Sequence, residues 1–415
     1  MAKIKKIKAR EILSSSGLPT LEVEVQLNFG KSGYASVPFG ASAGSREAVT
    51  LFDGDKKRYG GKGMQRAIKN VEEKIAPILV GKNPLRQKEI DEMMIKLDGT
   101  ENKSALGGNA ILAVSLAAAR AGAAVKKMEL YKYLRWIYGF GGHDFKMPKP
   151  MIVVIEGGKH AEHSTDFQEY LIAPKKASVA ENLRAGVEIY QALKKILERR
   201  GLATTVGAEG AFAPAGLSNE EPWQLILQAI KKAGYRAGVD VGLAADLAAS
   251  EIFKNGKYEL RREGKKMTSE QLIEYLAEWL KKYPIISIED PLAETDWGGW
   301  TLAFKQLRKK VRIIADDLTA TNKILLEKML DLRAAAGIII KPNQIGTLSE
   351  TAETIILAQK NKIATIVSHR GGGETNDTFI VDLAVAFGCE FLKVGITRGE
   401  RVAKYNRLLE IERGL

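Results

Sequence analysis

Six short, mostly apolar segments in the second half of the chain are each followed directly by an ionisable residue. The segments are 239–245, 284–288, 311–315, 335–340, 363–368 and 391–392, and the residues that follow them are Asp246, Glu289, Asp316, Lys341, His369 and Lys393. Short apolar runs of this kind are typical of buried strands. Chance is a poor explanation for so regular a pattern, so we interpret these residues as parts of one chemical site.

The carboxylates Asp246, Glu289 and Asp316 offer hard oxygen atoms, which suit Mg²⁺ better than zinc. Alone, they could equally form a salt-bridge network with the two lysines. With Lys341 and Lys393, they could instead remove a proton from a carbon beside a carboxylate. A metal and one lysine would stabilise the extra negative charge, while the other lysine, desolvated by its surroundings, would act as the base.

If a β-hydroxyl then leaves, an acid is needed on the opposite face, and two further segments supply candidates. Residues 157–161 (GGKHA) contain His160 and precede a predicted strand at 166–170. Residues 207–214 (GAEGAFAP) form a small-residue loop with one acid, Glu209. Either residue could have a structural role instead, His160 as a buried hydrogen-bonded side chain and Glu209 as the cap of a turn.

The spacing of the strand ends predicts the elements that position them. The intervals between residues 246, 289, 316, 341, 369 and 393 are 43, 27, 25, 28 and 24 residues. Most of them fit one strand, one helix and two loops. This is the repeat of a β/α barrel, in which catalytic groups lie at the carboxyl ends of the strands. We therefore predict an α/β protein with a TIM-like β/α barrel.

The first third of the chain predicts a smaller α+β domain. Residues 20–29 alternate between apolar and polar, as a half-buried strand does, and residues 34–38 form a second short run that ends in the small-residue loop 40–44. The helical patterns that follow span 62–80, 87–97 and 109–127.

Glycine and proline are concentrated in residues 139–150, which is typical of a linker. We place the domain boundary there. The prediction is an N-terminal α+β domain over residues 1–138 and a catalytic barrel over residues 139–415.

The composition argues against several classes of protein. A single cysteine, Cys389, excludes a disulfide framework and a cysteine metal site, which fits a reducing cytoplasm. The N-terminus is basic but lacks the apolar run of a secretory signal. No segment reaches the roughly 18 apolar residues that span a membrane. The nearest, 110–125, contains Arg120 and is predicted to be a buried helix, so we expect a cytoplasmic protein that does not contact membranes.

The formal net charge of +13 has two interpretations. It could simply reflect a solvated basic surface, because lysines are interspersed with acids along the helices. It could also attract an anionic partner, either a phosphorylated metabolite or nucleic acid. No nucleic-acid motif accompanies the charge and aromatic residues are not interleaved with it, so a small phosphorylated acid is the expected partner.

Seven segments, in order and at matching spacing, resemble the enolase family (phosphopyruvate hydratases) over almost the whole chain. They are LDGTENKS at 97–104, DFQE at 166–169, SIEDPL at 287–292, DDL at 316–318, KPNQIGTL at 341–348, SHR at 368–370 and ERVAKYN at 400–406. A series of this kind is highly specific for common ancestry and less specific for the exact reaction.

The resemblance implies reversible Mg²⁺-dependent dehydration of 2-phosphoglycerate to phosphoenolpyruvate, a step of glycolysis and gluconeogenesis. It also implies a barrel that begins with two strands and two helices, and a homo-oligomer. The matching site positions are the metal ligands Asp246, Glu289 and Asp316, the general base Lys341, the enolate-stabilising Lys393, the general acid Glu209 with Glu169 beside it, the histidines His160 and His369, the substrate contact Gln168, and Arg370 with Gly371 at the phosphate.

The sequence departs from the family in loops around the site. Phe39 replaces a serine that contacts a second, substrate-dependent Mg²⁺, and 371–373 (GGG) replaces Ser-Gly in the phosphate loop. Glu156 replaces an asparagine, and Ala208 replaces an acid next to the general acid. Ser16 replaces an arginine that often supports the subunit contact.

These departures leave three interpretations open. The protein could be an enolase that tolerates altered loops, or an enolase-derived lyase that acts on another anionic or phosphorylated hydroxy acid. It could also be a binding protein without catalysis. Retention of both lysines, both glutamates and the three metal ligands argues against the last, because a binding scaffold has no chemical need for the full set.

Overall fold

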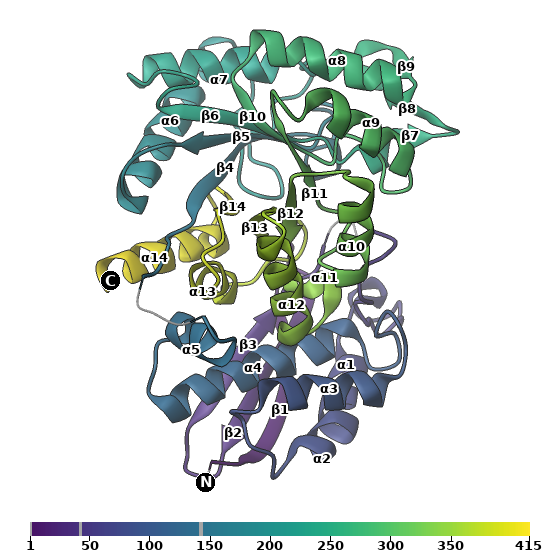
Figure 1. Ribbon diagram of the computed structural model, residues 1–415, viewed down its shortest axis with the longest axis vertical. Coiled ribbons are helices and arrows are strands. Elements are labelled where there is room, and N and C mark those ends of the chain that lie inside the picture. The colour runs from purple at the N-terminus through teal and green to yellow at the C-terminus, as the bar shows by residue number, and fades with distance from the viewer. Residues whose placement is uncertain (1, 41–43, 141–143) are drawn as a thin grey trace.

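The computed structural model describes residues 2–40, 44–140 and 144–415. An N-terminal sheet with its helices is stacked against a barrel along the long axis (Figure 1). The predicted loop at 40–44 and the predicted boundary segment each include residues outside these ranges, 41–43 and 141–143. The domain limits at 138 and 139 therefore stay a prediction.

The N-terminal sheet is antiparallel, in the order β1-β2-β3. Its strands are β1 (Ile4–Leu13), β2 (Pro19–Leu27) and β3 (Ser32–Val37). The last two correspond to the predicted strands, because β2 buries every second residue from Leu21 to Leu27. The sequence did not predict β1, whose pairing shifts in register between Ile4 and Lys6 and whose buried residues therefore do not alternate strictly.

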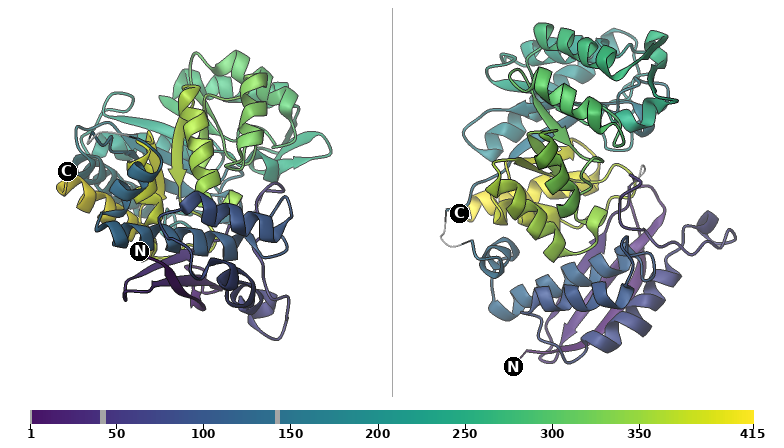
Figure 2. Two further views of the ribbon diagram at one scale, coloured as in Figure 1. Left: turned by 60° about the horizontal axis from the view of Figure 1, so that its bottom comes forward. Right: turned by 45° about the vertical axis from the view of Figure 1, so that its right-hand side comes forward.

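The helices that accompany this sheet largely follow the predicted pattern. They are α1 (Gln65–Lys69), α2 (Ala76–Leu79), α3 (Gln87–Asp98), α4 (Gly108–Lys126) and α5 (Leu130–Ile137). Helices α1, α2 and α4 pack on the sheet, and α3 and α5 pack on α4. The predicted helix at 62–80 is divided into α1 and α2 by a wider turn at Asn70–Ile75. The further views show α3 and α4 between the sheet and the barrel (Figure 2).

The barrel is closed, in the order β10-β11-β12-β13-β14-β4-β5-β6. Its strands are β4 (Lys149–Glu156), β5 (Glu169–Pro174), β6 (Val241–Asp246), β10 (Ile285–Glu289), β11 (Arg312–Ala315), β12 (Gly337–Ile340), β13 (Ala364–Ser368) and β14 (Phe391–Gly395). β5 is antiparallel to both neighbours, and the other adjacent strands are parallel. This confirms the predicted TIM-like barrel with an irregular start.

Helices follow the strands around the barrel, after the paired start of β4 and β5. They are α6 (Val179–Arg199), α7 (Glu221–Lys232), α8 (Ser269–Lys282), α9 (Trp297–Leu307), α10 (Lys323–Leu332), α11 (Pro342–Ile345), α12 (Leu348–Lys360), α13 (Phe379–Ala386) and α14 (Gly399–Arg413). A small sheet of β7 (Phe253–Lys254), β8 (Lys257–Leu260) and β9 (Lys265–Met267) follows β6. Several helices begin at a side-chain cap, such as Thr268 before α8.

The N-terminal part contacts the barrel through buried and partly buried polar bonds. Asp91 on α3 accepts a hydrogen bond from the Ser349 backbone N–H at 2.9 Å. Arg120 on α4 donates two bonds to Asp377, of 2.5 and 2.7 Å. Because partner groups in such buried contacts are costly to leave unpaired, they fix how the two parts sit together.

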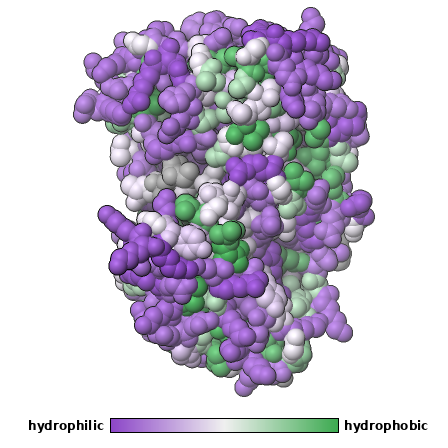
Figure 3. Space-filling view, turned by 180° about the vertical axis from the view of Figure 1, so that it is seen from behind, coloured by the Kyte–Doolittle hydropathy of each residue, from purple (hydrophilic) through white to green (hydrophobic). Residues whose placement is uncertain are grey.

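The molecule buries its most apolar long helix. By length and composition α4 could cross a membrane, but 83% of its most apolar window is buried inside the protein. This confirms the predicted buried helix. The face in Figure 3 is predominantly hydrophilic, and its hydrophobic residues form small separate patches, as on an ordinary surface.

A glycine allows β3 to lie directly on α4. A Cβ atom on Gly33 would come within 2.1 Å of the Ala117 carbonyl oxygen and 2.3 Å of the Ala121 nitrogen. Both are backbone atoms of a helix, so they cannot move aside as a side chain would.

We predict that Gly33→Ala lowers the free energy of unfolding by about 1–3 kcal/mol or more, because the added methyl forces the sheet off the helix. Gly298→Ala is the matched control, since a Cβ there meets nothing within 4 Å. It should be neutral or slightly stabilising, as alanine favours a helix. Urea denaturation of both variants measures this, and equal effects would contradict the packing argument.

Candidate active site

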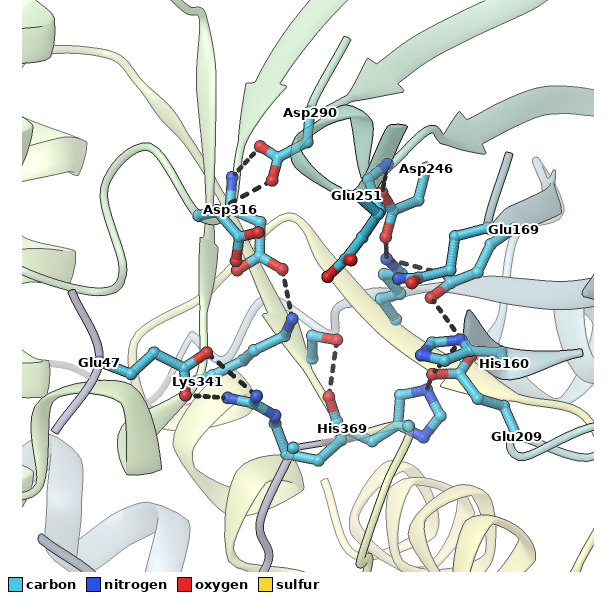
Figure 4. Close-up of a pocket in the computed structure, with 18 residues that line it drawn as sticks. Glu47, His160, Glu169, Glu209, Asp246, Glu251, Asp290, Asp316, Lys341 and His369 are labelled. Atoms are coloured by element: carbon cyan, nitrogen blue, oxygen red, sulfur yellow. Dashed lines mark hydrogen bonds and ion pairs between the residues drawn. The ribbon is translucent and has the colours of Figure 1, made fainter. Parts of the chain in front are cut away.

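A pocket lined mainly by charged and polar side chains lies at the carboxyl ends of the barrel strands (Figure 4). All predicted site residues except Glu289 line it, and Glu289 contacts the lining residue Lys393. The structure therefore brings the predicted residues together, while their individual roles stay predictions. Lining residues that the sequence did not predict include Glu47, Glu251, Asp290 and Asp317.

The three predicted metal ligands lie at the ends of neighbouring strands. In the strand register Asp246 lies opposite Glu289, and Glu289 lies opposite Ile314, two residues before Asp316. The three carboxyls are only 3%, 4% and 5% exposed. Carboxylates so deeply buried cannot stay ionised without compensating positive charge.

In this structure two lysines provide that charge. Lys393 Nζ lies 2.9 Å from Asp246 Oδ2, 2.8 Å from Glu289 Oε2 and 2.9 Å from Glu169 Oε2. Lys341 Nζ donates to Asp316 Oδ2. Burial acts to lower the pKa of Lys393, but the surrounding carboxylates outweigh it and hold that pKa well above the ordinary value.

The same carboxylates fit a Mg²⁺ ion by their donor chemistry, which is all oxygen. Two further buried oxygens nearby, Gln168 Oε1 and Glu209 Oε2, form no hydrogen bond with any residue that the structure describes. Buried polar atoms are normally paired, so these two are available to a bound ligand.

Asp316 also belongs to a tighter group with Asp290 and Asp317, whose oxygens lie within 4.8 Å of one another. Asp290 accepts the backbone N–H of Asp316 at 2.8 Å and of Asp317 at 3.0 Å, and so holds the chain after β11. Burial, reinforced by Asp316, raises the pKa of Asp317 to about 8. The group adds a second set of oxygens suited to a cation.

The acidic side of the pocket holds two glutamates and two histidines. His160 Nδ1 lies 3.6 Å from Glu169 Oε1 and 3.6 Å from Glu209 Oε1, and His369 Nε2 lies 3.2 Å from Glu209 Oε1. Burial raises the pKa of Glu169 well above its usual range, and the Glu209 charge adds to this. Burial opposes ionisation of Glu209, yet His369 and His160 hold its pKa well below the usual range. The environment therefore favours the protonated form at Glu169 and the ionised form at Glu209.

Arg370, the predicted phosphate contact, is held by a residue from the N-terminal part of the chain. Its two terminal nitrogens donate to Glu47 at 2.9 and 3.0 Å. The sequence did not reveal Glu47, because it lies 323 positions from its partner and in no strand-end pattern. An anion that bound Arg370 would compete with this carboxylate.

The absence of a side chain at Gly371 leaves room for His160 and Glu209. A Cβ at this position would come within 2.4 Å of His160 Nε2 and 2.9 Å of Glu209 Oε1. A larger residue at 371 would have to displace one of these side chains, so what residue 371 itself offers an anion is its backbone N–H.

Phe39 packs away from the pocket and against the other altered loop. It forms two backbone hydrogen bonds with Gly373, of 3.1 and 2.8 Å, the second to its own carbonyl oxygen. A Cβ on Gly373 would lie 2.2 Å from the Phe39 ring, which also meets the Phe52 ring edge-on at 5.8 Å. The doubt that Phe39 raises about a second Mg²⁺ site stays a prediction.

Comparison with known families matches both parts of the chain. The model described as "Enolase, N-terminal domain" matches residues 4–134, and the one described as "Enolase, C-terminal TIM barrel domain" matches residues 144–415. The two matches together span nearly the whole sequence and agree with the barrel and the smaller N-terminal part described above.

We predict that Mg²⁺ stabilises the folded protein, because only the folded state assembles the buried carboxylates. At about one hundred times its dissociation constant, the ion should add roughly 2.7 kcal/mol to the free energy of unfolding. Thermal melts with Mg²⁺ and with a chelator measure this.

Glu289→Gln should remove at least half of that gain, since it removes one charged ligand. Glu353→Gln, at a surface carboxylate 43% exposed, is the control and should keep the full gain. A full gain in Glu289→Gln would rule out Glu289 as a ligand.

Proposed function

Because the chain belongs to the enolase family, we propose that it catalyses the reversible dehydration of 2-phosphoglycerate to phosphoenolpyruvate with Mg²⁺. Membership of the family makes it an enzyme of the enolase superfamily. One observation supports the specific reaction above all. A lysine and a pair of glutamates face one pocket from opposite sides (Figure 4), and the pKa values of the two glutamates are shifted in opposite directions.

We assign the base to Lys341, which would take the proton from C2 of the substrate. The electron pair of the broken C–H bond moves into the substrate carboxylate, whose added charge Lys393 stabilises from strand β14, two strands along the barrel from β12. Mg²⁺, when bound by Asp246, Glu289 and Asp316, would supply further positive charge to that carboxylate. Lys393 and the metal ligands thus share one task, which is stabilising the enolate.

Lys341 must be neutral to accept a proton. Burial alone would lower the pKa of Lys341, but Asp316 outweighs it and raises that pKa above the ordinary value in this structure. Engagement of Asp316 by another cation would leave burial as the dominant influence and bring Lys341 closer to neutrality.

The second step needs a proton on the opposite side. The electron pair held by the enolate returns to form the C2=C3 double bond. The C3–O bond breaks at the same time, and the hydroxyl takes up a proton and leaves as water. We assign the proton to the Glu169–Glu209 pair, with Glu209 as the group that faces the leaving oxygen. His160 lies 3.6 Å from both carboxyls and can relay the proton between them.

The altered phosphate loop supports a second candidate, a lyase that acts on a different anionic hydroxy acid. Arg370 is paired with Glu47, and residue 371 offers a backbone N–H in place of a side chain. Phosphate binding then depends on separating Arg370 from Glu47. A less charged anion could bind in the pocket without Arg370 having to leave Glu47 for it.

The sequence also predicts an oligomeric state and a cellular location. A homo-oligomer and a cytoplasmic location follow from the family resemblance and the composition. Both stay predictions.

The direct test follows the ultraviolet absorbance of the enol phosphate formed from 2-phosphoglycerate and Mg²⁺. Lys341→Ala should reduce the rate by about 10²–10⁴-fold, the range expected on losing a general base. A chelator should abolish turnover. Lys305→Ala, at an exposed lysine of α9, is the control and should leave the rate unchanged. Undiminished turnover in Lys341→Ala would refute the assignment of the base.

A panel of hydroxy acids in deuterated water separates the two candidates. Exchange or elimination with another hydroxy acid, and none with 2-phosphoglycerate, would favour the second candidate. Turnover of 2-phosphoglycerate above all others would favour the first.

A further inference from the structure

Glu156 is a fully buried carboxyl directly behind the pocket. It is the last residue of β4 and is 0% exposed, and it is not among the residues that line the pocket. Its two oxygens accept the backbone N–H of Glu209 at 3.1 and 3.0 Å, and Oε1 also accepts the N–H of Ala211 at 2.7 Å. One side chain therefore binds the loop on both sides of Gly210.

The loop is shaped around this carboxyl. A Cβ on Gly207 would lie 2.7 Å from Glu156 Oε2. A Cβ on Gly395 would lie 1.9 Å from the Glu209 carbonyl oxygen, so the loop is also pressed against β14. The β4 backbone adds two bonds, from Phe212 N–H to the Val154 carbonyl at 3.1 Å and from Glu156 N–H to the Phe212 carbonyl at 2.9 Å.

The residue held in this way has its side chain in the pocket. The Glu209 carboxyl lies beside His369 and His160, and its atom Oε2 forms no hydrogen bond with any described residue. Its backbone N–H is fixed from behind by Glu156. The position of the proposed acid relative to a substrate thus depends on a carboxyl that the substrate does not touch.

We propose that Glu156 is the positioning residue of Glu209, holding the loop at 207–211 so that the Glu209 carboxyl faces the leaving hydroxyl. This inference rests on the proposed dehydration. It assigns Glu156 to the second step, loss of the hydroxyl, and not to removal of the C2 proton by Lys341 on the other side of the pocket.

The charge state of Glu156 fits this task. Burial, reinforced by the Glu209 charge, raises the pKa of Glu156 to about 8. The group is therefore mostly protonated at neutral pH and places no second full charge behind Glu209. One oxygen is enough to accept both N–H groups, as Oε1 does here. A glutamine has such an oxygen, whereas an alanine has none.

The experiment measures two rates on 2-phosphoglycerate with Mg²⁺, namely exchange of the C2 proton with deuterated solvent and formation of the enol phosphate. Glu156→Ala should lower product formation by about 10–100-fold, as expected for a displaced catalytic group. Exchange at C2 should fall less than about threefold, because Lys341 keeps its contacts. Glu156→Gln should restore product formation to within about threefold of the wild type, since it keeps an acceptor.

The matched control is Asp91→Ala. Asp91 is likewise 0% exposed and accepts a backbone N–H, but it lies on α3 away from the pocket. It should lower stability without changing the ratio of exchange to product formation. Equal loss of both rates in Glu156→Ala, or no rescue by glutamine, would overturn the proposal.

A wild-type protein that neither exchanges nor dehydrates 2-phosphoglycerate would refute the proposed function instead. Hydrogen exchange of the Glu209 and Ala211 amides then tests, without any substrate, the inference that Glu156 holds the loop at 207–211. Faster exchange of these amides in Glu156→Ala than in Glu156→Gln supports it, and equal exchange refutes it.

Discussion

Buried negative charge at the mouth of the barrel is the constraint on which the rest of the structure depends. Three carboxyls, Glu169, Asp246 and Glu289, surround the ammonium of Lys393 at 2.8–2.9 Å. An unpaired carboxylate at such depth costs several kcal/mol or takes up a proton. Positively charged side chains must therefore lie at the same height along the barrel axis as the acids. The register of the strands determines that height. This requirement explains why lysines and acids are found together on the same rim.

The irregular start of the barrel serves this arrangement. Because β5 is antiparallel to both neighbours, its first residue and not its last lies at the rim. That first residue is Glu169, opposite Asp246 in the register. A regular parallel strand would place its amino end at the far side of the barrel. The antiparallel strand thus adds a carboxyl to the rim just where β4 supplies Glu156 to hold the neighbouring loop.

The sequence predicted two strand-end residues correctly, because Asp246 and Glu289 are the last residues of β6 and β10. Lys393 was predicted to follow its strand but lies inside β14, which continues to Gly395. The sequence could not predict that Arg370 is paired with Glu47, since no local pattern connects residues so far apart. Nor did alternation reveal β1, whose register shift breaks the period of two. The barrel, repeated and locally encoded, was predictable, whereas contacts across the two parts of the chain depend on tertiary packing that periodicity does not contain.

The pairing of Phe39 with Gly373 has a consequence for how the two altered loops can move. Two backbone hydrogen bonds and the ring contact join a segment of the N-terminal part to the loop after β13. Moving either segment away from the other would therefore break both hydrogen bonds and uncover one buried aromatic ring. The two loops at which this sequence departs from the family are thus coupled, and a change in one is felt by the other.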